Sequence, residues 1–111
     1  MKPLTALHYS ILSIYEQILV DCYPFNYIMT AMGVSHIDYL ALDIEGAETD
    51  VLQTIDFTRF RIDILTIEYH QHNENGAFEL KLAKIMELFK KLKVYQQVPT
   101  DGEYMFARVD L

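Results

Sequence analysis

The stretch IDYLALDIEGAE, residues 37–48, decides the fold, because an apolar run passes directly into an acidic turn that contains a glycine. Residues 37–42 are apolar except for Asp38, and a run of this length between polar residues predicts a strand covered on both faces. Asp43, Glu45 and Gly46 follow in the turn, and the apolar spacing after Glu48 predicts a helix. A strand, a turn and a helix in this order predict one unit of a parallel α/β sheet.

The segment before this unit predicts a further strand and helix. Residues 18–22 are short and β-prone. Pro24 suits the first turn of a helix that runs to about Met32, because its fixed φ matches the helical value. Gly33 is the residue type that most often ends a helix in the left-handed conformation.

The segments after it continue the alternation. Residues 62–69 predict a strand, and a polar loop over residues 70–76 leads into the most regular amphipathic helix of the chain. Residues 94–98 and 104–109 predict two strands joined by a turn too short for a crossover, so we expect them to pair antiparallel. The predicted fold class is therefore α/β, with parallel strands and an antiparallel C-terminal hairpin at the edge of the sheet.

Length and composition limit the function classes. The 111 residues suffice for one small domain, and the formal net charge of −7 argues against a nucleic-acid surface. The lysines of the predicted long helix are expected on its solvated face. Residues 1–19 fit a helical stripe and a strand equally well, but they are too polar to span a membrane. Cys22, the only cysteine, excludes an internal disulfide and is compatible with a reducing compartment.

Two groups of polar residues follow predicted strands, where parallel sheets bind their ligands. The first is the Asp43–Glu48 turn, in which Glu48 is expected mainly to favour the helix N-terminus. The second contains Glu68, His70 and His72, which share one side of an extended chain and could form a metal site with Asp43 or Glu45. A polar loop with exposed histidines is the favoured interpretation, so no metal site is predicted. His70 remains a candidate general base.

The residues Asp43, Glu45, Gly46 and Glu48 match an Asp-x-Glu-Gly-x-Glu pattern at a strand end, and this region resembles the FkbM-type methyltransferases. That resemblance extends over residues 20–111, so we divide the chain into an ambiguous segment 1–19 and the C-terminal portion of a methyltransferase domain. It implies a partial Rossmann-like class I sheet in which residues 37–42 form a central strand.

The same resemblance implies the chemistry. It implies S-adenosylmethionine as cofactor and methyl transfer, commonly to an oxygen of a small-molecule, glycan or lipid acceptor. By that similarity Asp43 and Glu45 would line the cleft as catalytic residues, beside His70 as the candidate general base named above, and Asp43, Glu45 and Gly46 would contact the cofactor. The glycine-rich turn of such enzymes has no counterpart here, because none of the four glycines forms a GxG pattern. We therefore expect a truncated domain with weak or no activity by itself.

Two alternatives stay open. A remnant of the fold could act as a non-catalytic interaction module, because an unpaired apolar strand promotes self-association. A small metal-binding domain could use Asp43, Glu45 and His70. His8 and His36 have no ligand candidates near them in this scheme, and we expect both to be structural or exposed.

Overall fold

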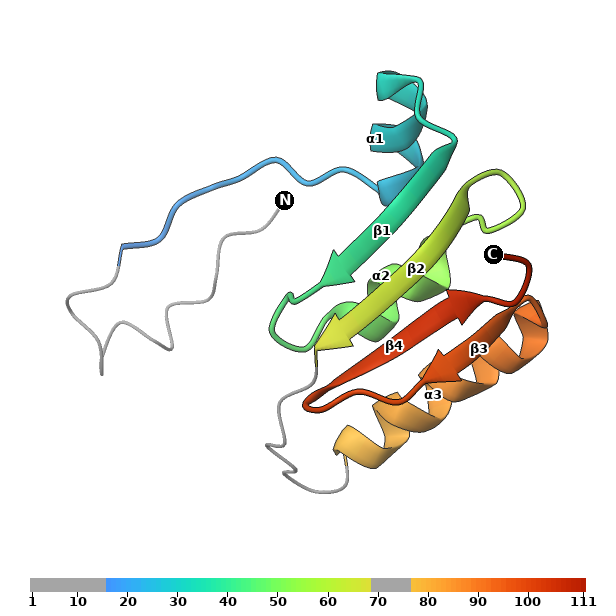
Figure 1. Ribbon diagram of the computed structural model, residues 1–111. Helices are drawn as coiled ribbons and strands as arrows, with labels where there is room; N and C mark the ends of the chain where they lie inside the picture. The colour runs from blue at the N-terminus through green and yellow to red at the C-terminus, as the bar shows by residue number, and fades with distance from the viewer. Residues whose placement is uncertain (1–15, 69–76) are drawn as a thin grey trace.

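The structure is a computed structural model that describes residues 16–68 and 77–111 (Figure 1). Most predicted elements are confirmed within a residue or two. Residues 18–22 are an exception, because they form no strand. The elements are α1 (Phe25–Met32), β1 (His36–Leu42), α2 (Glu48–Thr54), β2 (Arg61–Glu68), α3 (Ala77–Leu92), β3 (Tyr95–Val98) and β4 (Glu103–Arg108).

The four strands form one mixed sheet in the order β1-β2-β4-β3. β1 and β2 are parallel, whereas β4 is antiparallel to both of its neighbours, β2 and β3. The antiparallel C-terminal hairpin at the edge of the sheet is therefore confirmed, with β3 as the outermost strand and β4 between it and β2. The crossover through α3 places β3 two positions from β2 in the sheet, and β4 fills the position between them.

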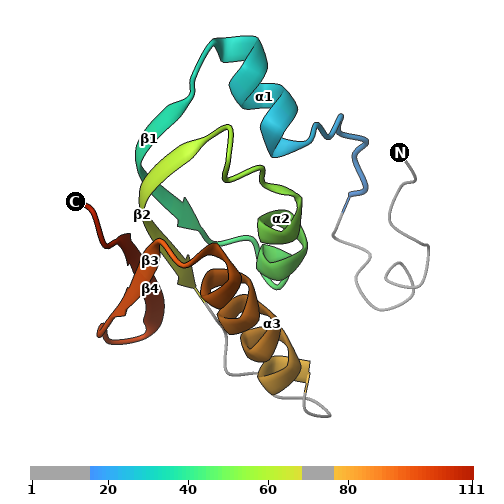
Figure 2. The ribbon, with the colours of Figure 1, turned by 90° about the vertical axis from the view of Figure 1, so that its right-hand side faces the viewer.

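The core lies between the sheet and its helices, all three of which are on one side of the sheet (Figure 2). Leu52 of α2 and Leu65 of β2 are completely buried there. Phe89 of α3 stacks on Phe106 of β4, with ring centroids 4.0 Å apart. No helix within residues 16–68 and 77–111 combines the length and the apolar character required to cross a bilayer.

β1 differs most from its prediction. It is an edge strand of the described sheet, and only Leu42 among its residues is buried. Tyr39 and Ala41 are exposed although they belong to an apolar run. The expectation of a strand covered on both faces is therefore wrong for the described part of the chain, because the helices cover only one face and β2 pairs only one edge.

β1 and β2 share an irregularity near their N-terminal ends. In β1, Ile37 and Leu40 both pack against the core, and in β2, Ile62 and Leu65 do the same. A regular strand brings every second residue to one face, so the spacing of three shows that each strand shifts phase between these residues. Because both strands shift together, Ile37 stays paired with Ile62, and Leu40 with Leu65.

Candidate functional site

Carboxylates gather where β1 and β2 end. Leu42 pairs with Ile67, so Asp43 and Glu68 follow at the same edge of the sheet. Glu68 in turn pairs with Glu103 at the start of β4. The end of the sheet at which β1 and β2 finish therefore carries Asp43, Glu68 and Glu103.

The turn between β1 and α2 is held by Glu48. Its side chain is only 7% exposed, and its two carboxylate oxygens accept hydrogen bonds from the backbone N–H of Ile44 at 2.9 Å and of Gly46 at 3.0 Å. As the first residue of α2, it also places negative charge at the positive end of the helix dipole. Glu48 therefore shapes the turn, in agreement with its expected role at the helix N-terminus.

The backbone of the turn takes two positive φ angles in succession. Glu45 has a φ of 56° and Gly46 a φ of 110°. The first value is tolerated by ordinary residues at some cost, whereas the second is a conformation that strongly favours glycine. The glycine of the acidic motif is thus required by the path of the chain.

Lys81 connects this turn to α3. Its Nζ donates a hydrogen bond to the carbonyl oxygen of Gly46 at 2.5 Å. A Cβ atom added to Gly46 would lie 3.2 Å from that nitrogen, so any larger residue would also crowd the lysine. The sequence predicted Lys81 only as part of a solvated face, and no local pattern indicates a contact across 35 residues.

Asp43 and Glu45 project from the supported turn, and both are exposed. No side chain or backbone group of the described residues binds the Asp43 carboxylate, whereas Glu45 has a contact of its own. Asp43 therefore presents a carboxylate to solvent at the tip of β1, where it can orient a cationic or hydroxyl-bearing ligand.

Of the second predicted group of polar residues, the structure describes only Glu68. Glu68 ends β2, is half-buried and has a contact of its own. His70 and His72 lie outside the described residues. Their proposed roles as general base and metal ligand therefore remain predictions.

The expectation for His36 is wrong in one respect, because the structure gives it partners. Its Nε2 lies 2.7 Å from Oδ2 of Asp63 and 3.7 Å from Oδ1 of Asp38. Hydrogen bonds from His36 and Arg61 lower the pKa of the Asp63 carboxyl. Asp38 lies on the predicted strand and His36 directly before it, so their spacing of two residues could have indicated a shared face, whereas the register that adds Asp63 is not local.

Comparison with known proteins gives one match. A model of the methyltransferase FkbM domain matches residues 3–98, a range that includes the Asp43–Glu48 turn and ends with β3. No curated protein and no solved structure matches the chain. The mixed α/β sheet is consistent with a methyltransferase-like fold, and a match over most of the chain establishes the relationship. The chain belongs to the FkbM methyltransferase domain family.

Proposed function

We propose that residues 20–111 form the C-terminal portion of a class I methyltransferase domain that uses S-adenosylmethionine and methylates an oxygen of its acceptor. The observation that carries this proposal is the acidic turn at the C-terminal end of β1, in a strand that pairs parallel with β2. In open α/β sheets, ligands bind outside the carboxyl ends of parallel strands. The family match supports the general activity, and the turn supplies the candidate site.

The methyl donor is a sulfonium cation, and the acidic edge suits it. The sulfonium supplies an activated methyl group when it is bound, so the protein's tasks are alignment and exclusion of water. Asp43 and Glu45 would orient the donor and the acceptor hydroxyl, and Gly46 would let the backbone come close to the cofactor because it carries no side chain. His70 would accept the hydroxyl proton.

The residues present would hold only part of such a cofactor. Gly33, Gly46, Gly76 and Gly102 are far apart in sequence, so none can form the glycine-rich turn that receives a nucleotide-like ligand. In this proposal that turn, with the strand that would pair with the outer edge of β1, comes from polypeptide outside residues 20–111. Within the described residues, no strand pairs with that edge.

Binding of S-adenosylhomocysteine, measured by calorimetry, tests the proposal. We expect no measurable binding to the 111-residue chain, and binding to a fusion in which the first strands and glycine turn of a complete FkbM-type enzyme precede residue 20. In the fusion, Asp43→Asn should weaken binding at least about tenfold, the loss of one charge-assisted hydrogen bond. Asp50→Asn, an exposed acid on α2, is the matched control. A folded fusion that binds nothing, or equal affinities of the two variants, would contradict the assignment.

A second candidate function is protein interaction through the outer edge of β1. Large apolar side chains are exposed on this strand, along α1, which has no buried residue, and in the segment that precedes α1. They are Ile18, Leu19, Val20, Tyr23, Tyr27, Ile28, Met32 and Tyr39. Such a surface next to an unpaired strand promotes self-association. Sedimentation velocity over a concentration series should show oligomers, and a monodisperse monomer at all concentrations would exclude this function for the isolated chain.

A further inference from the structure

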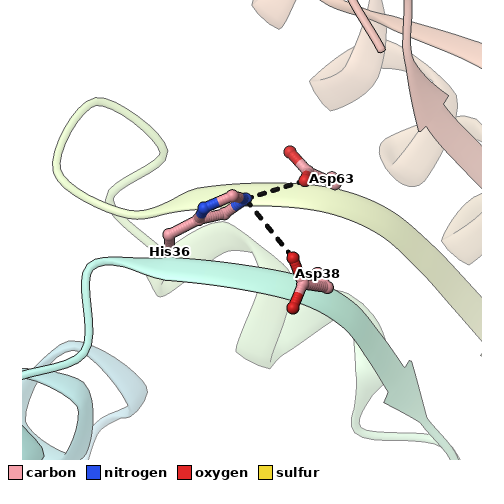
Figure 3. Close-up of side chains that lie close together, drawn as sticks. All are labelled: His36, Asp38 and Asp63. Carbon is pink, nitrogen blue, oxygen red and sulfur yellow. Dashed lines mark hydrogen bonds and ion pairs between the residues drawn. The ribbon is translucent and has the colours of Figure 1, made fainter.

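A second cluster of ligand-type side chains lies at the opposite end of β1 and β2 from the acidic turn. His36 and Asp38 come from β1, and Asp63 comes from β2 (Figure 3). One nitrogen or oxygen atom from each of the three side chains lies within 4.8 Å of the other two. The cluster therefore brings together one imidazole and two carboxylates from two strands. His36 and Asp63, which are in contact, are 27 residues apart in the sequence.

The sheet register explains why these groups meet. Ile37 pairs with Ile62 and Tyr39 pairs with Ile64, so Asp38 and Asp63 occupy neighbouring positions between these two pairs. Since Ile37 and Ile62 pack against the core, the residues that follow them point away from the helices. The alternation of side chains along the two strands thus places both carboxylates on the open face of the sheet.

The charges around the cluster leave an excess of negative charge. Arg61 Nε binds Oδ1 of Asp63 at 2.7 Å, and its Nη1 contacts Asp110 at 3.3 Å. Arg108 is also paired with Asp110. Three carboxylates therefore face two guanidinium groups. Asp38, whose side chain is 95% exposed, has only His36 as an ion-pair partner in the described residues.

We propose that His36, Asp38 and Asp63 bind a divalent transition-metal ion of the zinc or cobalt type, with water completing the coordination. An imidazole nitrogen with carboxylate oxygens suits these ions, whereas Mg²⁺ and Ca²⁺ prefer oxygen ligands alone. This inference does not depend on the proposed methyltransferase activity, because the cluster is at the other end of the strands.

The geometry is close to what such an ion requires. Zinc bonds of about 2.0–2.2 Å to nitrogen and oxygen place the ligand atoms of a tetrahedral site about 3.3–3.6 Å apart. The observed separations of 2.7 Å and 3.7 Å lie on either side of this range. All three ligand atoms lie within 4.8 Å of one another, and the Asp38 side chain, which is 95% exposed, is free to rotate toward an ion held by His36 and Asp63.

Binding of the ion exchanges one hydrogen bond of the cluster for bonds to the metal. The ion replaces the hydrogen bond between Nε2 of His36 and Oδ2 of Asp63, and any proton held between them passes to solvent. Arg61 keeps its bond to the other oxygen of Asp63 and would orient that carboxylate for the ion.

Titration of the full chain with CoCl₂, followed by visible absorption, tests the site. We expect a saturable signal that ZnCl₂ displaces and that an equal concentration of MgCl₂ does not. His36→Gln and Asp38→Asn should each weaken Co²⁺ binding about tenfold or more, the size of effect seen when metal-site residues are lost. Asp38 is almost fully exposed, so its variant should fold even if an Asp63 variant does not.

Matched variants distinguish Co²⁺ binding at this site from non-specific attraction of the cation to an acidic protein. Asp50→Asn removes one exposed acid from α2 and should leave Co²⁺ affinity unchanged. A fall in affinity for Asp50→Asn equal to that for Asp38→Asn would overturn the proposal. So would unchanged affinity in His36→Gln, which would assign the binding to other histidines, or the absence of any saturable signal in the unaltered chain.

Discussion

Glu48 is the side chain on which the acidic turn depends, and its replacement by glutamine should destabilise the domain far more than its small chemical change suggests. The carboxylate accepts the N–H groups of Ile44 and Gly46, one on each oxygen. Glutamine keeps a single acceptor oxygen and presents an NH₂ group in place of the other. One backbone N–H therefore loses its acceptor and faces a donor.

The magnitude follows from three contributions. Loss of one hydrogen bond to a charged group costs about 1.5–3 kcal/mol, and the remaining bond weakens by about 1 kcal/mol when its acceptor becomes neutral. The lost charge at the N-terminus of α2 adds about 0.3–1 kcal/mol. Because the turn can relax toward water, we expect Glu48→Gln to lower the free energy of unfolding by about 2–4 kcal/mol, a large share of the roughly 5–15 kcal/mol typical of a domain.

Urea unfolding at pH 7, followed by circular dichroism, measures this change. Asp50→Asn is the control, because Asp50 is an exposed acid in the same first turn of α2 and should cost no more than about 0.5 kcal/mol. Hydrogen exchange at the amides of Ile44 and Gly46 gives a local readout, and both should exchange faster in Glu48→Gln. A stability within about 0.5 kcal/mol of the control, with unchanged exchange at both amides, would refute this account of the turn.

Three further measurements test other parts of the structure. Leu52→Ala removes a completely buried side chain between α2 and the sheet, so urea unfolding should show a loss of about 2–5 kcal/mol, and a loss below 1 would mean that α2 packs differently. Tyr39→Phe removes the 2.6 Å hydrogen bond to the buried Thr66 hydroxyl and should cost about 1 kcal/mol in the same assay, whereas no change would place the tyrosine elsewhere. The pKa of Asp110 is lowered to about 2 from its ordinary value of 3.8, mainly by hydrogen bonds from Arg108, so its NMR titration should shift upward toward 3.8 in Arg108→Gln. Since the folded-state pKa is the lower one, the stabilisation by this pair is complete above pH 4 and is lost as the pH falls toward 2, and an unaltered titration in Arg108→Gln would contradict it.

Local sequence patterns carried the prediction of individual elements. The apolar spacing of α3 indicated a helix with one buried face, and Gly33 ends α1 with a φ of 70°, as its type predicted. The acidic turn was found in the same way, because Asp43, Glu45 and Gly46 follow an apolar run directly. Periods of 2 and 3.6 residues and the conformational freedom of glycine act over a few residues, so one sequence is enough to recognise them.

The sequence by itself therefore determined the order of helices and strands, the acidic turn after β1 and the family resemblance that the FkbM match supports. Only the tertiary structure decided that β4 lies between β2 and β3, that Lys81 contacts Gly46, and that His36 and Asp63 meet. The reason is that strand order and register depend on how distant segments pack against a common core, where the free energy comes from many side chains together. No run of neighbouring residues encodes such a contact, because its partners are about 30 residues apart.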